Sequence, residues 1–180
     1  MADTKLSDED VRREIEKRKN AAKELRLPEV VAFLFEELCS YPAWQKTAKE
    51  DCFPGIINPR EVKVDEVPGV AFVFNGNEYG LGQHDWHVTM PDGDECYSRD
   101  YFIYNANKEI VFQTTGFLEY DEFGSSYRFR DIEAFIPGRW TMDILELYRE
   151  LKSFTEQQEA NWEKEEEANE TQELRKKFGL

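Results

Sequence analysis

The sequence predicts an α+β fold: two N-terminal helices, a five- to six-stranded antiparallel meander sheet and a long C-terminal helix. Three observations support this. Apolar residues recur at helical spacing in residues 1–50, short β-favouring runs alternate with turn residues over residues 60–137, and helical spacing returns after residue 141. We expect the helices to cover one face of a curved sheet.

The N-terminal region has clear signals for where its helices start and stop. Ser7 is expected to cap the first helix, because its hydroxyl can accept a backbone N–H and three acidic residues follow it. Pro28 ends this helix and suits the first turn of the next. That second helix, residues 29–40, is apolar on nearly all sides, which indicates a buried position. An irregular connection is expected around Trp44, marked by Pro42, Pro54 and Pro59.

The middle region is divided by turn residues every ten to fifteen positions. Val62, Val64 and Val67 suggest an edge strand before Pro68. Asn-Gly at residues 75–76 is a strong hairpin signal between alternating apolar residues. Further turns are expected at Pro91–Asp94, Asn105–Lys108 and Phe123–Ser126, and Ile136-Pro137-Gly138 closes the sheet.

The last helix is expected to start at Thr141 as its cap, and its apolar stripe fades after Phe154. We therefore predict a single α+β domain over residues 1–162. Within it, residues 1–50 are helical, 60–137 form the sheet and 141–162 form the packed helix. Residues 163–180 are expected to form a Glu-rich solvated extension or tail.

Composition and charge exclude several classes of protein. The 180 residues carry a formal charge of −15, and the acidic excess is greatest between residues 51 and 139. Such a chain lacks the basic face that direct nucleic-acid binding requires. No apolar run reaches the length of a membrane span or of a secretory signal. Cys39, Cys52 and Cys96 lack C-x-x-C spacing, which favours reduced thiols and a cytoplasmic protein.

Two local motifs suggest metal binding, and each has a simpler structural explanation. His84 and His87 are the only histidines. Residues three apart on a strand point to opposite faces, so the two rings could share a metal only at a backbone bend. Asp92-Gly93-Asp94-Glu95 resembles part of a calcium loop, but it lacks the full ligand pattern and fits a β-turn. We expect no metal and no cofactor.

A second hypothesis places a small-ligand or enzymatic pocket in the concave sheet. Cys96 could pair with a histidine as a nucleophile, and Arg128 with Arg130 could clamp an anion. The alternative for the arginines is cross-strand pairing with Glu119, Asp121 or Glu122. The pocket hypothesis requires convergence of five side chains: His84, His87, Cys96, Arg128 and Arg130.

The leading hypothesis is a non-enzymatic interaction protein, and it assigns no catalytic residue. Carboxylates steer a basic partner, while aromatic side chains anchor it at short range. We expect the protein to inhibit a basic partner by occluding it, as an immunity protein or as an antagonist of a nuclease or nucleic-acid-binding factor. The protein itself is expected to be a monomer or a homodimer. The expected partner surface comprises Asp92, Asp94, Glu95, Tyr97, Asp100, Glu119, Tyr120, Asp121, Glu122 and Phe123.

Overall fold

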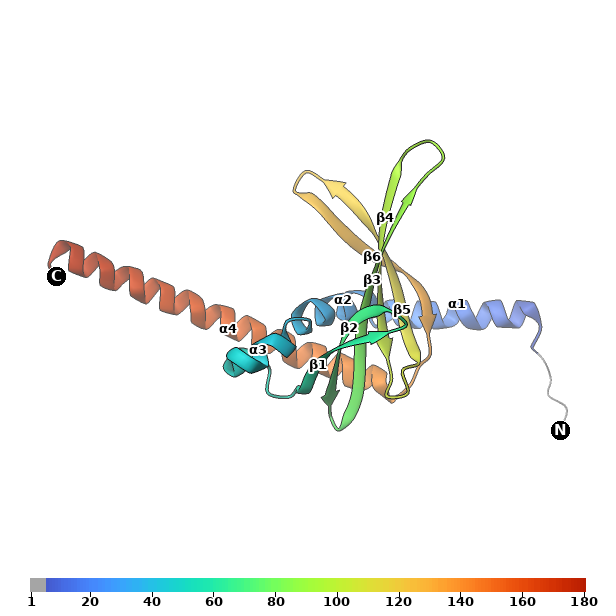
Figure 1. The fold of residues 1–180 in the computed structure, drawn as a ribbon, viewed down its shortest axis with the longest axis horizontal. Coiled ribbons are helices and arrows are strands. Elements are labelled where there is room, and N and C mark those ends of the chain that lie inside the picture. Colours follow the sequence, from blue (N-terminus) through green and yellow to red (C-terminus); the bar gives the residue numbers. More distant parts are fainter. Residues whose placement is uncertain (1–5) are drawn as a thin grey trace.

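The sheet has six antiparallel strands in chain order, and the helices lie on one of its faces (Figure 1). The computed structural model describes residues 6–180. The predicted α+β fold is confirmed, with six strands. The helices are α1 (Asp8–Glu24), α2 (Leu27–Leu38), α3 (Tyr41–Thr47), the single 3₁₀ turn η1 (Lys49–Asp51) and α4 (Arg139–Phe178). The strands are β1 (Ile57–Val64), β2 (Val67–Phe74), β3 (Asn77–Thr89), β4 (Glu95–Tyr104), β5 (Ile110–Asp121) and β6 (Gly124–Phe135).

The predicted start of the first helix is confirmed. The Ser7 hydroxyl accepts the backbone N–H of Asp10 at 3.2 Å, and the Asp10 carboxylate accepts the backbone N–H of Ser7 at 3.3 Å. This reciprocal capping box satisfies two donors that a helix start otherwise leaves unpaired. Pro28 lies in the first turn of α2, as expected from its fixed φ.

Two predicted helix boundaries differ from the structure. The connection around Trp44 contains a short helix, α3, because Pro42 occupies a first-turn position as Pro28 does. The last helix begins at Arg139 and not at Thr141, and Gly138 occupies its N-cap position. Thr141 lies inside the first turn and is buried, so its hydroxyl does not cap the helix.

Hairpin turns fix the register of the sheet. Asn75 and Gly76 both have positive φ, at 50° and 77°, and join Phe74 to its partner Asn77 as predicted. Asp65 and Glu66 form a similar turn, at 50° and 65°, between β1 and β2. The sequence did not predict that second turn, because it contains neither glycine nor asparagine.

The core lies between the sheet and helices α2 and α4. Leu81, Tyr101 and Ile103 are fully buried on the helix side of the sheet. The Phe33 ring on α2 packs edge-on against Tyr148 on α4, with ring centroids 5.2 Å apart. The last buried residue of α4 is Leu151, Phe154 still packs edge-on against Phe53, and Gln158 Nε2 donates to the Glu50 carbonyl at 3.1 Å. Beyond these contacts the helix continues away from the body to Phe178.

Candidate functional site

Two hairpin arms project from the sheet beyond the helical layer (Figure 1). Strands β4 and β5 pair as far as Ser98 and Phe117, and past this point they separate. We call residues 86–98 the β3–β4 arm and residues 117–128 the β5–β6 arm. Each arm has three acidic residues, and together they contain one arginine and no lysine. The arms are therefore locally acidic and stand clear of the core.

The helix-side face of the β3–β4 arm carries a small cluster of contacting polar and aromatic groups. His87 and Tyr97 are cross-strand partners, and their rings stack with centroids 4.6 Å apart. The Tyr97 hydroxyl donates to Glu95 Oε2 at 2.9 Å, and His87 Nε2 contacts the same oxygen. These contacts lower the pKa of Glu95, mainly through the Tyr97 hydrogen bond and next through His87. The cluster keeps Glu95 charged.

Removing the Tyr97 hydroxyl is expected to raise the pKa of Glu95 back toward 4.5. Tyr97→Phe and His87→Ala should each raise it, because both side chains contact Glu95 Oε2 and favour the charged carboxylate. In the native protein, the charged contact is retained until the pH falls through that lowered pKa. Carbon-detected NMR titration of the Glu95 carboxyl measures the shift. Phe123→Leu on the other arm serves as control, and an unmoved titration in Tyr97→Phe would contradict the assignment.

The outer face of the arms carries exposed aromatic side chains that the expected surface omitted. Trp86, Ser98, Phe117 and Arg128 follow one another across four strands. Trp86 is 51% exposed and Phe117 is 49% exposed. Exposed large apolar groups on one face of a projecting element are typical of binding surfaces. Phe117 could have been predicted from its position in the alternating pattern of the strand that leads to the turn at residues 123–126.

Asp100 is not part of the exposed surface, so that prediction is wrong. Its side chain is 6% exposed and lies at the base of the arms. Its carboxylate accepts hydrogen bonds from Trp86 Nε1 and Thr115 Oγ1, both at 2.6 Å. Buried carboxylates require such partners. Asp100 therefore joins β3 to β5 and orients the Trp86 ring.

The other predicted surface residues lie on the two arms. Tyr120 is 75% exposed and Phe123, at the hairpin tip, is 90% exposed. Glu119 is half-buried and forms an ion pair with Arg128 at 2.7 Å. Four carboxylates are exposed and make no ion pair within residues 6–180: Asp92, Asp94, Asp121 and Glu122.

The side chains of the alternative pocket do not converge. His84 pairs with Asp100 on the outer face, and His87 pairs with Tyr97 on the helix side, as strand alternation predicted. Cys96 is exposed and pairs with Val88, four residues along β3 from His84. His84 and Cys96 thus lie apart on the outer face, and His87 lies on the opposite face. The predicted pocket is therefore wrong for them.

The two arginines are also apart, because β6 contains a bulge at Arg130. Gly116 pairs with Phe129 and Thr115 pairs with Asp131, which leaves Arg130 without a partner position on β5. Arg130 lines a shallow hollow beside the turn between α1 and α2. Arg128 pairs with Glu119 on the outer face, which confirms the cross-strand alternative for that residue.

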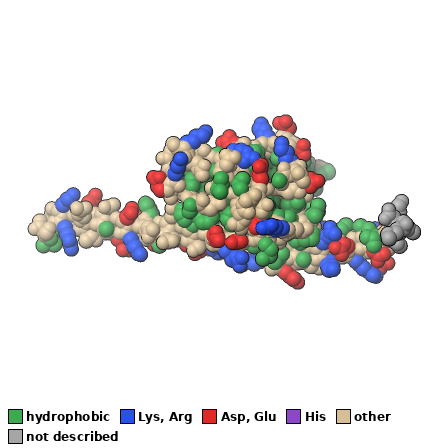
Figure 2. Space-filling view, turned by 90° about the horizontal axis from the view of Figure 1, so that it is seen from below, with side chains coloured by type: hydrophobic (Ala, Val, Ile, Leu, Met, Phe, Trp, Pro, Cys, Tyr) green, Lys and Arg blue, Asp and Glu red, His purple; other side chains and the backbone are tan. Residues whose placement is uncertain are grey.

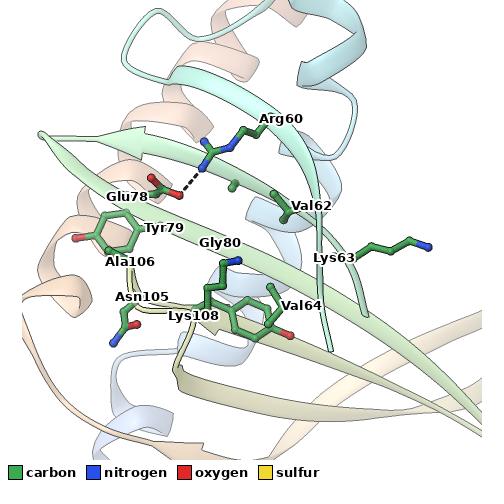
Figure 3. Close-up of a pocket in the computed structure, with 12 residues that line it drawn as sticks. Arg60, Val62, Lys63, Val64, Glu78, Tyr79, Gly80, Asn105, Ala106 and Lys108 are labelled. Carbon is green, nitrogen blue, oxygen red and sulfur yellow. Dashed lines mark hydrogen bonds and ion pairs between the residues drawn. The ribbon is translucent and has the colours of Figure 1, made fainter. Parts of the chain in front are cut away.

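A separate cavity of about 250 Å³ lies between β1 and the β4–β5 turn (Figure 3). Val62, Val64, Gly80 and Tyr104 form its walls, and Arg60, Lys63 and Lys108 lie around it. Arg60 is paired with Glu78, and Lys63 points away from the cavity. Burial and, to a lesser extent, nearby Asp65 raise the pKa of Tyr104 to about 12, so its hydroxyl stays neutral. Of these three cations, only Lys108 is then placed to attract a ligand into the cavity. The cavity is therefore a weaker candidate for the functional site than the arms.

Within residues 6–180, no group of three or more His, Cys, Asp or Glu side chains is placed to hold a metal ion. In the same part of the chain, no helix has both the length and the apolar character needed to cross a membrane. Comparison of the chain with protein-family models, with curated proteins and with solved structures finds no match.

Proposed function

We propose that this protein is a non-enzymatic binding protein whose two arms bind a basic protein partner and occlude it. The observation that carries the proposal is the combination on each arm of exposed carboxylates with exposed aromatic rings. Unpaired carboxylates raise the association rate with a basic surface, and aromatic anchors slow dissociation. The partner class would be a toxin neutralised by an immunity protein, or a nuclease or other nucleic-acid-binding factor. The phosphate-binding site of a nuclease or nucleic-acid-binding factor is basic, and clustered carboxylates are complementary to it in charge.

The arms are suited to this task by their position as well as by their chemistry. They project past the helices, so a partner can contact both of their faces without displacing the core. The buried Asp100 bridge fixes the base of the arms, which reduces the ordering cost on binding. We place the protein in the cytoplasm, where its three unpaired cysteines would stay reduced.

Affinity capture from a lysate of the source cells tests the proposal. We expect the immobilised protein to retain one dominant basic protein at low salt and to lose most of it at high salt. The decisive comparison is with an arm variant in which Asp92, Asp94, Glu95, Asp121 and Glu122 are replaced by the matching amides.

A matched control replaces five carboxylates elsewhere by amides: Glu61, Asp65, Glu66, Glu109 and Glu133. This control has the same charge change and should retain the partner, while the arm variant should lose it. If both variants retain the partner equally, the arms are not the binding surface.

A further inference from the structure

We propose that the protein forms an antiparallel homodimer in which α1 of each copy pairs with the end of α4 of the other. The first part of α1, residues 8–18, and the last part of α4, residues 161–178, are exposed along their whole length and project from the body. The rest of α1 packs on the body through Ala21 and Ala22. The two exposed segments leave the body at opposite ends, along its lower edge in Figure 2. Since the two helices point apart, they cannot meet within one copy. A second copy, turned by a twofold rotation, would bring α4 of one beside α1 of the other.

Each projecting helix carries apolar side chains that the body does not cover. On α1, Val11 and Ile15 lie on the same face as the buried Ala22 but remain exposed. Leu174 and Phe178 are four residues apart near the end of α4 and are also exposed. Apolar groups at this spacing on an amphipathic helix indicate a helical partner.

The charges of the two segments are opposite. Residues 12–23 of α1 contain six basic and two acidic residues, whereas residues 156–173 of α4 contain eight acidic and one basic residue. Pairing α4 with a second α4 would bring like charges together, which is unfavourable. Pairing α4 with α1 brings unlike charges together. Electrostatics therefore favours pairing of α1 with α4 over pairing of α4 with a second α4.

One antiparallel register matches opposite charges between the exposed part of α1 and the end of α4. Placing Arg12 opposite Glu173 also places Lys19 opposite Glu166, because both pairs are seven residues apart. The same register sets Val11 opposite Leu174. It also sets the acidic start of α1, residues 8–10, opposite the basic residues 175–177 of α4. The change of charge sign thus occurs at matching positions on both helices.

The twofold arrangement uses this helix pair twice. An isologous interface repeats every contact, so each matched pair of charges contributes at both ends of the dimer. It also closes the assembly at two copies, because both projecting segments of each copy are then used. The arms lie elsewhere on the molecule and remain free, so the dimer would present two pairs of arms.

Sedimentation equilibrium of the full chain tests the proposal, and the expected mass is twice 21.3 kDa. Arg12→Glu with Lys19→Glu should raise the dimer dissociation constant at least about tenfold, and so should Glu166→Lys with Glu173→Lys. Combining all four substitutions restores opposite charges across the interface and should restore the dimer. Lys63→Glu with Lys108→Glu, on β1 and in the β4–β5 turn, is the control and should leave the mass unchanged.

Three results would overturn this proposal. The first is a wild-type protein that stays monomeric at every concentration tested. The second is a dimer that neither double reversal weakens. The third is a fourfold variant as weakly associated as the double variants. Circular dichroism on each variant confirms that the projecting helices remain folded, so that loss of mass reports on association.

Discussion

Neutralising the five exposed arm carboxylates is expected to slow association with the captured basic partner about 10- to 100-fold at low ionic strength. These groups, Asp92, Asp94, Glu95, Asp121 and Glu122, act over a distance before contact forms. Their removal therefore lowers the association rate more than it raises the dissociation rate. Near physiological ionic strength, where the screening length is about 8 Å, the difference should shrink. Stopped-flow mixing at two salt concentrations measures both effects.

Aromatic substitutions on the same arms should produce the opposite kinetic pattern. Tyr120→Ala with Phe123→Ala removes two exposed rings and no charge. If these rings are anchors, the pair of substitutions should accelerate dissociation and leave association nearly unchanged. A loss of affinity through slower association in the aromatic variant would contradict this division of roles. It would indicate that the rings act on the shape of the arms and not as contacts.

Much of the fold could be predicted from the sequence because its local signals are strong. The Ser7 cap and the Asn75-Gly76 turn are short-range patterns that specify backbone geometry without reference to the rest of the chain. The Asp65–Glu66 turn lacks such a pattern. Its left-handed conformation is imposed by the pairing of Val64 with Val67. Tertiary pairing therefore fixes turns that local propensity does not predict.

The site was harder to predict because it depends on strand register. The arm carboxylates and rings were expected from their position near turns. Asp100 was also expected at the surface, but its strand lies where Trp86 and Thr115 can reach its carboxylate. Because of the bulge in β6, Arg130 does not follow Arg128 on the same face of the strand. The two arginines that were predicted as a pair therefore do not lie together. Bulges shift all later positions by one face, and no local residue pattern marked this one.

Asp143→Ala is expected to lower the free energy of unfolding by about 3 kcal/mol, because a buried acceptor for several donors disappears. Asp143 on α4 is 6% exposed. Its carboxylate accepts the Tyr79 hydroxyl and the Asn77 amide, the latter at 3.1 Å. Burial, followed by the hydrogen bond to Asp143, raises the pKa of Tyr79, which keeps the hydroxyl protonated as a donor. Asp143 therefore fastens the β2–β3 hairpin to the first turns of α4.

Two further variants separate this buried role from a general effect of charge. Tyr79→Phe removes one donor and leaves the carboxylate with its amide partners, so the expected loss is smaller, about 1 kcal/mol. Glu146→Ala removes an exposed acceptor of the Asn75 amide, at 3.1 Å, and should change stability by less than about 0.5 kcal/mol. Urea denaturation of the three variants gives the ranking. If Asp143→Ala proved no more destabilising than Glu146→Ala, the hairpin would be held to α4 by apolar packing alone. Tyr79 would then be important for its ring and not for its hydroxyl.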